Sequence, residues 1–145
     1  MSVEQGLQLY LNEVLLHVRE YKTELDELSE LSKLNTLNTR DYRAAERLLQ
    51  LLIEVSIGLS KHWLKSLNKE SGANAYQTFV GLHNINIISA EELVEWRKII
   101  GLRNSLVHDY LNVDKSIIQL VIKNERYKTL LVFCKQATTA LESVC

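Results

Sequence analysis

Two side chains in the C-terminal half of the chain, Arg103 and His108, have the types needed for chemistry on a phosphate group. A histidine can accept and return a proton near neutral pH. An arginine can hold phosphate oxygens through two parallel hydrogen bonds while negative charge builds on them. Together they could support attack of an RNA 2′-hydroxyl on the adjacent phosphorus, which DNA cannot undergo because it lacks that hydroxyl. This reaction requires no metal and no cofactor, and none is expected.

The helix that must carry these residues is predicted to begin after Ser89 and to run to about Leu111. A serine followed by acidic residues in the first turn is typical of a helix start. Its apolar stripe comprises Leu93, Trp96, Ile100 and Val107. Arg103 falls on this stripe, where leucine or isoleucine is expected, and Tyr110 continues it. A guanidinium in such a position is costly unless it meets an anion or a wet cleft.

A second line on the same helix is polar, and it comprises Arg97, Gly101, Asn104 and His108. Asn104 and His108 are neighbours on one face, and the missing side chain of Gly101 could leave room for another backbone or a substrate. Arg103 and His108 diverge by roughly 140° on an ideal helix. Either the helix distorts near its C-terminal end, or two chains place their motifs across a two-fold axis and share a cleft. We favour the second route.

The rest of the chain predicts an all-α antiparallel helical bundle in one domain, residues 1–145. The first helix has a single apolar seam at alternating spacings of four and three, and the middle of the second, Leu48 to Val55, is apolar nearly all round. This apolar excess also favours a partner chain. Besides the helix after Ser89, the predicted helices are Val3 to Leu34, Asp41 to Leu67, Ala75 to Leu82, Asp114 to Lys123 and Glu125 to Val144.

Several other polar or aromatic residues are interpreted as structural. Glu46, Gln50 and Glu54 share one face of the second helix, where a hydrogen-bond network is expected. The remaining histidines are expected to be structural or solvated, with His83 in the loop after the third helix, and the two tryptophans are expected to be core anchors. These residues are His17, His62, His83, Trp63 and Trp96.

Composition limits the remaining possibilities. The 17 basic and 18 acidic residues give a net charge of −1, which is low for a nonspecific nucleic-acid binder. The charge is uneven along the chain. Residues 1–34 contain three basic and seven acidic residues, whereas residues 35–145 contain 14 basic and 11 acidic residues. Any polyanion site is therefore expected outside the first helix. Cys134 and Cys145 are expected to be reduced thiols. Without a signal peptide or a long apolar segment, a cytoplasmic protein that does not contact the membrane is expected.

The pattern Arg103, His108, Tyr110 resembles the signature of HEPN ribonucleases of the HepT toxin type. The segment Arg43 to Glu54 is similar to the second helix of that family, and Gly101 to Asn104 ahead of Val107 and His108 is also typical of it. The match spans nearly the whole chain, and the motif shows no departure from the family pattern.

The resemblance implies a four-helix-bundle-like HEPN domain that acts as a homodimer, with Arg103 and His108 lining a cleft and Asn104 as the polar neighbour. The implied activity is that of a metal-independent RNA endonuclease, toxic to its own host cell, with no action on DNA. It further implies a type VII-like toxin–antitoxin pair, in which a minimal nucleotidyltransferase antitoxin transfers AMP from ATP to Tyr110. Phosphates added there would block the cleft and repel RNA.

Two alternatives remain open on the sequence. The chain could be a non-catalytic helical partner that scaffolds a nucleotidyltransferase, which its nearly neutral charge favours. It could also be a plain dimeric bundle without a ligand, but this leaves Arg103 on the apolar stripe unexplained.

Overall fold

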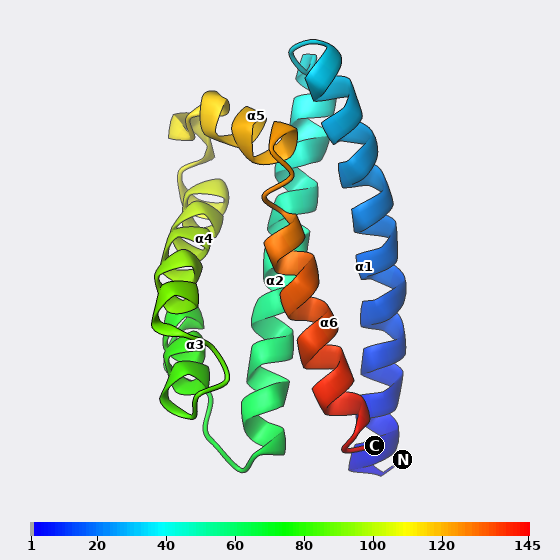
Figure 1. Ribbon diagram of the computed structural model, residues 1–145, viewed down its shortest axis with the longest axis vertical. Helices are drawn as coiled ribbons and strands as arrows, with labels where there is room; N and C mark the ends of the chain where they lie inside the picture. Colours follow the sequence, from blue (N-terminus) through cyan, green and yellow to red (C-terminus); the bar gives the residue numbers. More distant parts are fainter. Residues whose placement is uncertain (1) are drawn as a thin grey trace.

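The computed structural model describes residues 2–145, apart from the side chain of Tyr110. The described chain is all-α, without a strand, which confirms the predicted class (Figure 1). Its elements are α1 (Val3–Leu34), α2 (Thr39–Ser66), α3 (Ala75–Asn84), α4 (Ala90–His108), the 3-10 turn η1 (Tyr110–Asn112), α5 (Lys115–Lys123) and α6 (Lys128–Glu142). None of the described helices is both long enough and apolar enough to cross a membrane.

The helices begin largely where side-chain caps predict. Asn38 caps α2 by accepting from the Asp41 backbone N–H, so α2 begins two residues before the predicted Asp41. Ser89 and Glu92 form a complete capping box at the start of α4, as predicted. The sixth helix begins at Lys128 rather than at the predicted Glu125, because Glu125 has a φ of 55°, which is incompatible with a right-handed helix.

Two predictions about helix ends are wrong. α3 extends to Asn84, so His83 lies in a helix and not in the predicted loop. α4 ends at His108, three residues before the predicted Leu111, because Asp109 leaves helical geometry at φ −146° and ψ 39°. Val107 is correspondingly 40% exposed and does not belong to the buried stripe, in which Leu106 is buried instead.

α2 is the central helix of the bundle. It packs against α1, α3, α4, α5 and α6, and α5 lies across the end of the bundle between α4 and α2 (Figure 1). The apolar residues of Leu48 to Val55 are therefore buried or partly buried within one chain. The predicted central position is confirmed, but this segment gives no reason for a second chain, contrary to the expectation from its sequence.

An aromatic cluster fixes α4 against α3 and α6. The Trp96 ring stacks on Phe79 with a centroid separation of 4.0 Å and meets the edge of Phe133 at 4.9 Å. The Trp63 ring is tilted against Phe133, with ring centroids 6.0 Å apart. Both tryptophans are thus core anchors, as predicted, and Trp96 holds α4 in place two turns before Arg103.

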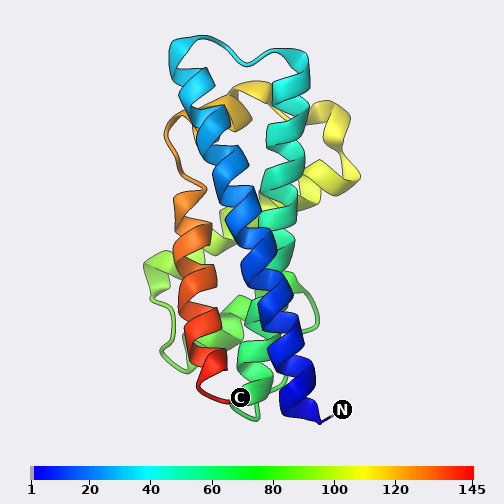
Figure 2. The ribbon, with the colours of Figure 1, turned by 90° about the vertical axis from the view of Figure 1, so that its right-hand side faces the viewer.

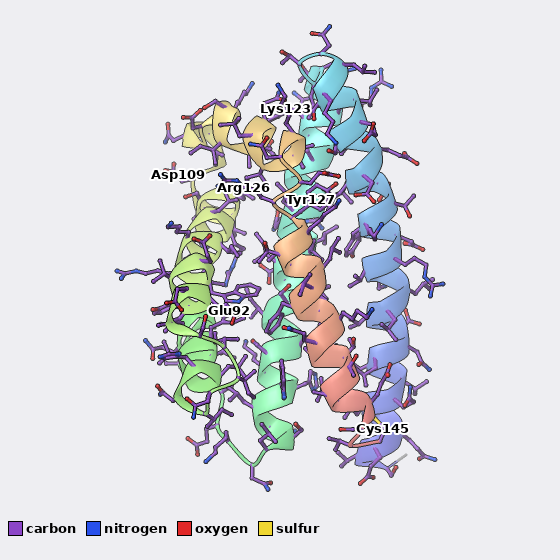
Figure 3. All side chains as sticks on the ribbon, in the orientation of Figure 1. Glu92, Asp109, Lys123, Arg126, Tyr127 and Cys145 are labelled. Atoms are coloured by element: carbon purple, nitrogen blue, oxygen red, sulfur yellow. The ribbon has the colours of Figure 1, made fainter. Side chains whose placement is uncertain are left out.

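Buried polar groups join α6 to its neighbours. The Tyr127 hydroxyl donates a 2.6 Å hydrogen bond to Asp26 of α1, and burial together with this carboxylate raises the pKa of Tyr127. Cys134 lies 3.4 Å from the Ser56 hydroxyl in the core. Figure 3 places Tyr127 and Cys145 at opposite ends of α6, and both cysteines are free, as predicted.

Candidate active site

Arg103 extends from α4 toward α2 and meets a carboxylate there. Its Nε lies 3.4 Å from Oε1 of Glu54, and its side chain is 20% exposed. The sequence predicted that this arginine needs an anion or a wet cleft, and Glu54 supplies the anion. Glu54 belongs to the polar face of α2 for which the sequence predicted a hydrogen-bond network. Sequence reasoning grouped Glu54 with Glu46 and Gln50 but did not connect it with Arg103.

The guanidinium is only partly engaged by this ion pair. Its Nε is buried and has no hydrogen-bond partner in the described part of the chain, so the exposed fraction of the side chain belongs to other atoms. A guanidinium carries five N–H donors. Arg103 is therefore neutralised by Glu54 while it keeps donor capacity for a further anion at the surface.

His108 and Asn104 lie on the exposed flank of α4. His108 is the last residue of the helix, and both side chains are exposed. Apart from the neighbouring backbone of α4 itself, no atom of the described residues lies within 4 Å of the position that a Cβ on Gly101 would occupy, so the space beside the polar line is open, as predicted. Behind His108, the Asp109 N–H donates to the Ser105 carbonyl at 2.8 Å, and the Asp109 carboxylate accepts from Asn112.

A single chain does not bring Arg103 and His108 together. α4 is a regular α-helix through both residues, so their directions still diverge by roughly 140°. Among the described residues, no hydrogen bond joins their side chains. The route by helix distortion is thus absent, because the distortion begins only after His108.

Tyr110, the predicted site of modification, lies beyond the end of α4. Its backbone begins η1, so it does not continue the apolar stripe of the helix as predicted. Its side chain lies outside the described part of the structure.

An apolar cavity in the described part of the molecule is separate from these residues. It has a volume of about 520 Å³ and lies between α2, α4, α5 and the start of α6, with Leu49, Ile99, Leu102 and Val121 in its lining. Arg103, Asn104 and His108 do not line it. The candidate site is therefore a surface at the α2–α4 seam and not an enclosed pocket.

The other histidines are structural or solvated, as predicted. His17 lies 3.6 Å from Glu13, and the Nδ1 atom of His83 lies 3.0 Å from the Ile88 carbonyl oxygen. The His62 ring packs on Tyr10 at 4.2 Å, and burial together with Lys65 lowers its pKa. Across the described residues, no group of three or more His, Cys, Asp or Glu side chains could hold a metal ion.

Comparison with known proteins places this chain in a family. The model of the family described as ribonuclease HepT-like matches residues 12–137, which include Arg103 and His108. The chain belongs to the HepT-like ribonuclease family. This confirms the resemblance seen in the sequence, and the family covers α2 through α5 and most of α1 and α6.

A curated relative carries a more specific description. The chain is 31% identical over 77 residues to the tRNA nuclease HepT of Aphanizomenon flos-aquae (strain 2012/KM1/D3), covering 53% of this chain and 52% of that protein. The match thus spans about half the length of this relative. No solved structure gives a significant match.

Proposed function

We propose that this chain is a metal-independent RNA endonuclease of the toxin type, acting in the cytoplasm. The observation that carries the proposal is the family match across Arg103 and His108, in which a partly buried arginine keeps free donors and a histidine lies exposed. The substrate is RNA, and transfer RNA is the first class to test because the relative is described as a tRNA nuclease.

In the proposed reaction, the RNA 2′-hydroxyl attacks the adjacent phosphorus and the 5′-oxygen of the next nucleotide leaves. His108 transfers protons between these oxygens, and the Arg103 guanidinium binds the phosphate oxygens as negative charge grows on them. Asn104, one turn before His108, is the supporting polar neighbour. The products are a 2′,3′-cyclic phosphate and a 5′-hydroxyl.

The two residues act together in a homodimer. Because they diverge on α4, a substrate held by Arg103 of one chain requires His108 of the partner chain. A two-fold axis beside α4 creates two such arrangements from the same surface. This proposal rests on the direction of the α4 side chains and on the family, since α2 is already covered within one chain.

The test is incubation of the purified, unmodified protein with total cellular RNA and with transfer RNA in EDTA. We expect RNA fragments that end in 2′,3′-cyclic phosphate and no cleavage of single-stranded DNA of the same sequence. If folded, unmodified protein left RNA intact, a non-catalytic partner of a nucleotidyltransferase would become the better function, in line with the near-neutral net charge.

A nucleotidyltransferase antitoxin is the proposed regulator, and it transfers AMP from ATP to the Tyr110 hydroxyl with release of pyrophosphate. We expect Tyr110→Phe to remain active on RNA after incubation with the antitoxin and ATP, because phenylalanine has no oxygen to accept AMP. Wild type treated in the same way should lose activity as its mass increases by AMP. Inhibition of the Tyr110→Phe variant with the same mass increase would place the modification on another residue.

Glu54 is expected to position Arg103 for this reaction. Glu54→Ala should slow RNA cleavage about tenfold, since a misplaced catalytic group loses activity steeply with small displacements. The free energy of unfolding should change by less than about 1 kcal/mol, because the pair is partly exposed. Rates at saturating RNA and urea unfolding curves measure the two effects.

Glu95→Ala is the matched control, because Glu95 pairs with Lys98 on α4 at 3.3 Å without contacting Arg103. It should leave both quantities close to wild type. Glu54→Gln, which keeps the side-chain shape, should recover part of the rate. Equal rates for Glu54→Ala and wild type would show that Arg103 needs no positioning by this carboxylate.

A further inference from the structure

The five basic residues of α2 all lie on one face of the helix. At 100° per residue, they fall within a sector of roughly 60°. Every one of them is exposed, and they extend from the first turn of the helix to its last. We call this set the α2 basic stripe, and it comprises Arg40, Arg43, Arg47, Lys61 and Lys65.

The charges of the α2 basic stripe are only partly compensated by neighbouring acids. None of its members forms an ion pair within the described chain. Glu46 lies one turn after Arg43; burial raises the pKa of Glu46, and nearby cations, Arg43 among them, act against this rise. Glu54 lies on the same face but is paired with Arg103. The stripe therefore carries an excess of positive charge although the chain as a whole has a net charge of −1.

Helix stability does not account for the N-terminal end of the stripe. Arg40 lies in the first turn of α2, where the positive end of the helix dipole repels a cation. Lys65, in the last turn, is by contrast favoured by the negative end of the dipole. The position of Arg40 therefore acts against the local electrostatics of the helix.

Contacts beside and within the stripe relate it to α1 and α4. Beside the stripe, His62 packs on Tyr10 of α1 at 4.2 Å. Within the stripe's own face, between Arg47 and Lys61, Glu54 pairs with Arg103 of α4. Figure 2 shows α6 on one side of α2 and the end of α4 projecting on the other. The two groups of cations in the α2 basic stripe thus lie on either side, along α2, of the position where Glu54 meets Arg103.

The stripe continues into a hollow at the C-terminal end of α2. This hollow has a volume of about 480 Å³ and is lined by Lys61, Lys65 and Lys69, with one acidic residue, Glu70. The distance along α2 from Arg40 to Lys65 is about 37 Å at 1.5 Å per residue. Such a length accommodates a run of several nucleotides.

We propose that the α2 basic stripe binds the phosphate backbone of RNA and directs the strand past Arg103. This inference rests on the proposed function, and it adds a substrate path outside the Arg103 and His108 positions. The stripe carries its cations in two groups, with about 21 Å of helix between Arg47 and Lys61 at 1.5 Å per residue. Exposed cations of this kind contact phosphates irrespective of base sequence. An interface with a protein needs apolar and aromatic anchors at its centre. The uncharged residues of this face beside Glu54 are Leu51 and Gly58, and both are partly buried, so the face offers no such anchor.

Binding of a fluorescent single-stranded RNA to protein carrying His108→Ala tests the proposal without cleavage. One variant carries Arg40→Gln, Arg43→Gln and Arg47→Gln, and another carries Lys61→Gln and Lys65→Gln. Glutamine preserves helix propensity, and circular dichroism verifies the fold. We expect the arginine variant to bind at least about tenfold more weakly near 0.1 M salt. Its plot of log affinity against log salt should be shallower by about 0.7 for each lost phosphate contact.

The matched control removes three exposed positive charges from other helices through Arg19→Gln, Lys123→Gln and Lys135→Gln. Its affinity should stay within about twofold of the parent protein. An RNA affinity and salt slope equal to the control would overturn the proposal. The proposal would also be overturned if the arginine variant bound RNA like the parent protein but lost binding of an acidic protein partner. Failure of wild type to cleave RNA would instead contradict the proposed function, without changing the conclusion on RNA binding by the α2 basic stripe.

Discussion

His108→Ala is expected to lower the rate of RNA cleavage in EDTA by at least about a hundredfold, the usual contribution of a positioned proton-transfer group. Arg103→Ala should cause a loss of similar size, because the charge developing on the phosphate oxygens loses its binding group. His108 is exposed at the end of α4, whereas Arg103 is 20% exposed and extends toward α2. Initial rates on transfer RNA, with unfolding curves for each variant, measure the effect.

His17→Ala is the matched control for His108, because His17 is also exposed on a helix but lies on α1, far along the chain from the motif. It should cleave like wild type. Arg103→Lys keeps the charge but not the two-pronged geometry, and it should remain well below wild type. A folded His108→Ala variant that cleaves at the wild-type rate would exclude His108 as the proton-transfer group.

Mixing the two inactive variants distinguishes a shared cleft from a site within one chain. In a mixed dimer, Arg103 from the His108→Ala chain and His108 from the Arg103→Ala chain complete one of the two arrangements. If subunits exchange freely, half of the dimers are mixed, so about a quarter of the wild-type activity should return. No recovery in a mixture proven to contain mixed dimers would place both groups of a site in one chain.

The sequence was most informative where local chemistry decides the structure. The bounds of α1 and the capping box of Ser89 and Glu92 follow from residues within a few positions of each other. By contrast, the C-terminal end of α4 depends on the backbone conformation of Asp109, and the start of α6 depends on that of Glu125. Glutamate has no strong preference for a positive φ, so the residue type at position 125 does not predict the turn before α6.

The candidate site was predictable in its residues but not in its contacts. The position of Arg103 on an apolar stripe indicated the need for an anion, yet Glu54 is distant in sequence and was one of several polar residues on α2. The spacing of Arg43, Arg47, Lys61 and Lys65 can be read from the sequence. A solvated face and a binding surface have the same pattern, however, and the positions of α1 and α4 are needed to tell them apart.

Trp96→Ala is expected to lower the free energy of unfolding by about 3–5 kcal/mol, the usual cost of truncating a large buried aromatic residue. Trp96 is 2% exposed and lies between Phe79 and Phe133, so its removal leaves a cavity where three helices meet. This is a large part of the stability of a typical domain. Urea unfolding followed by far-UV circular dichroism is the measurement, because tryptophan fluorescence changes with the substitution itself.

The matched control for Trp96→Ala is Val94→Ala, on the same helix but at a position that is 53% exposed. Its stability should change by no more than about 0.5 kcal/mol. Because Trp96 fixes α4 two turns before Arg103, Trp96→Ala should also slow RNA cleavage under conditions in which it remains folded, whereas Val94→Ala should not. A loss of less than about 1 kcal/mol for Trp96→Ala would contradict the packing of α4 on this aromatic cluster. The orientation of Arg103 toward Glu54 would then lose its structural basis, since that orientation depends on how α4 is held against α2.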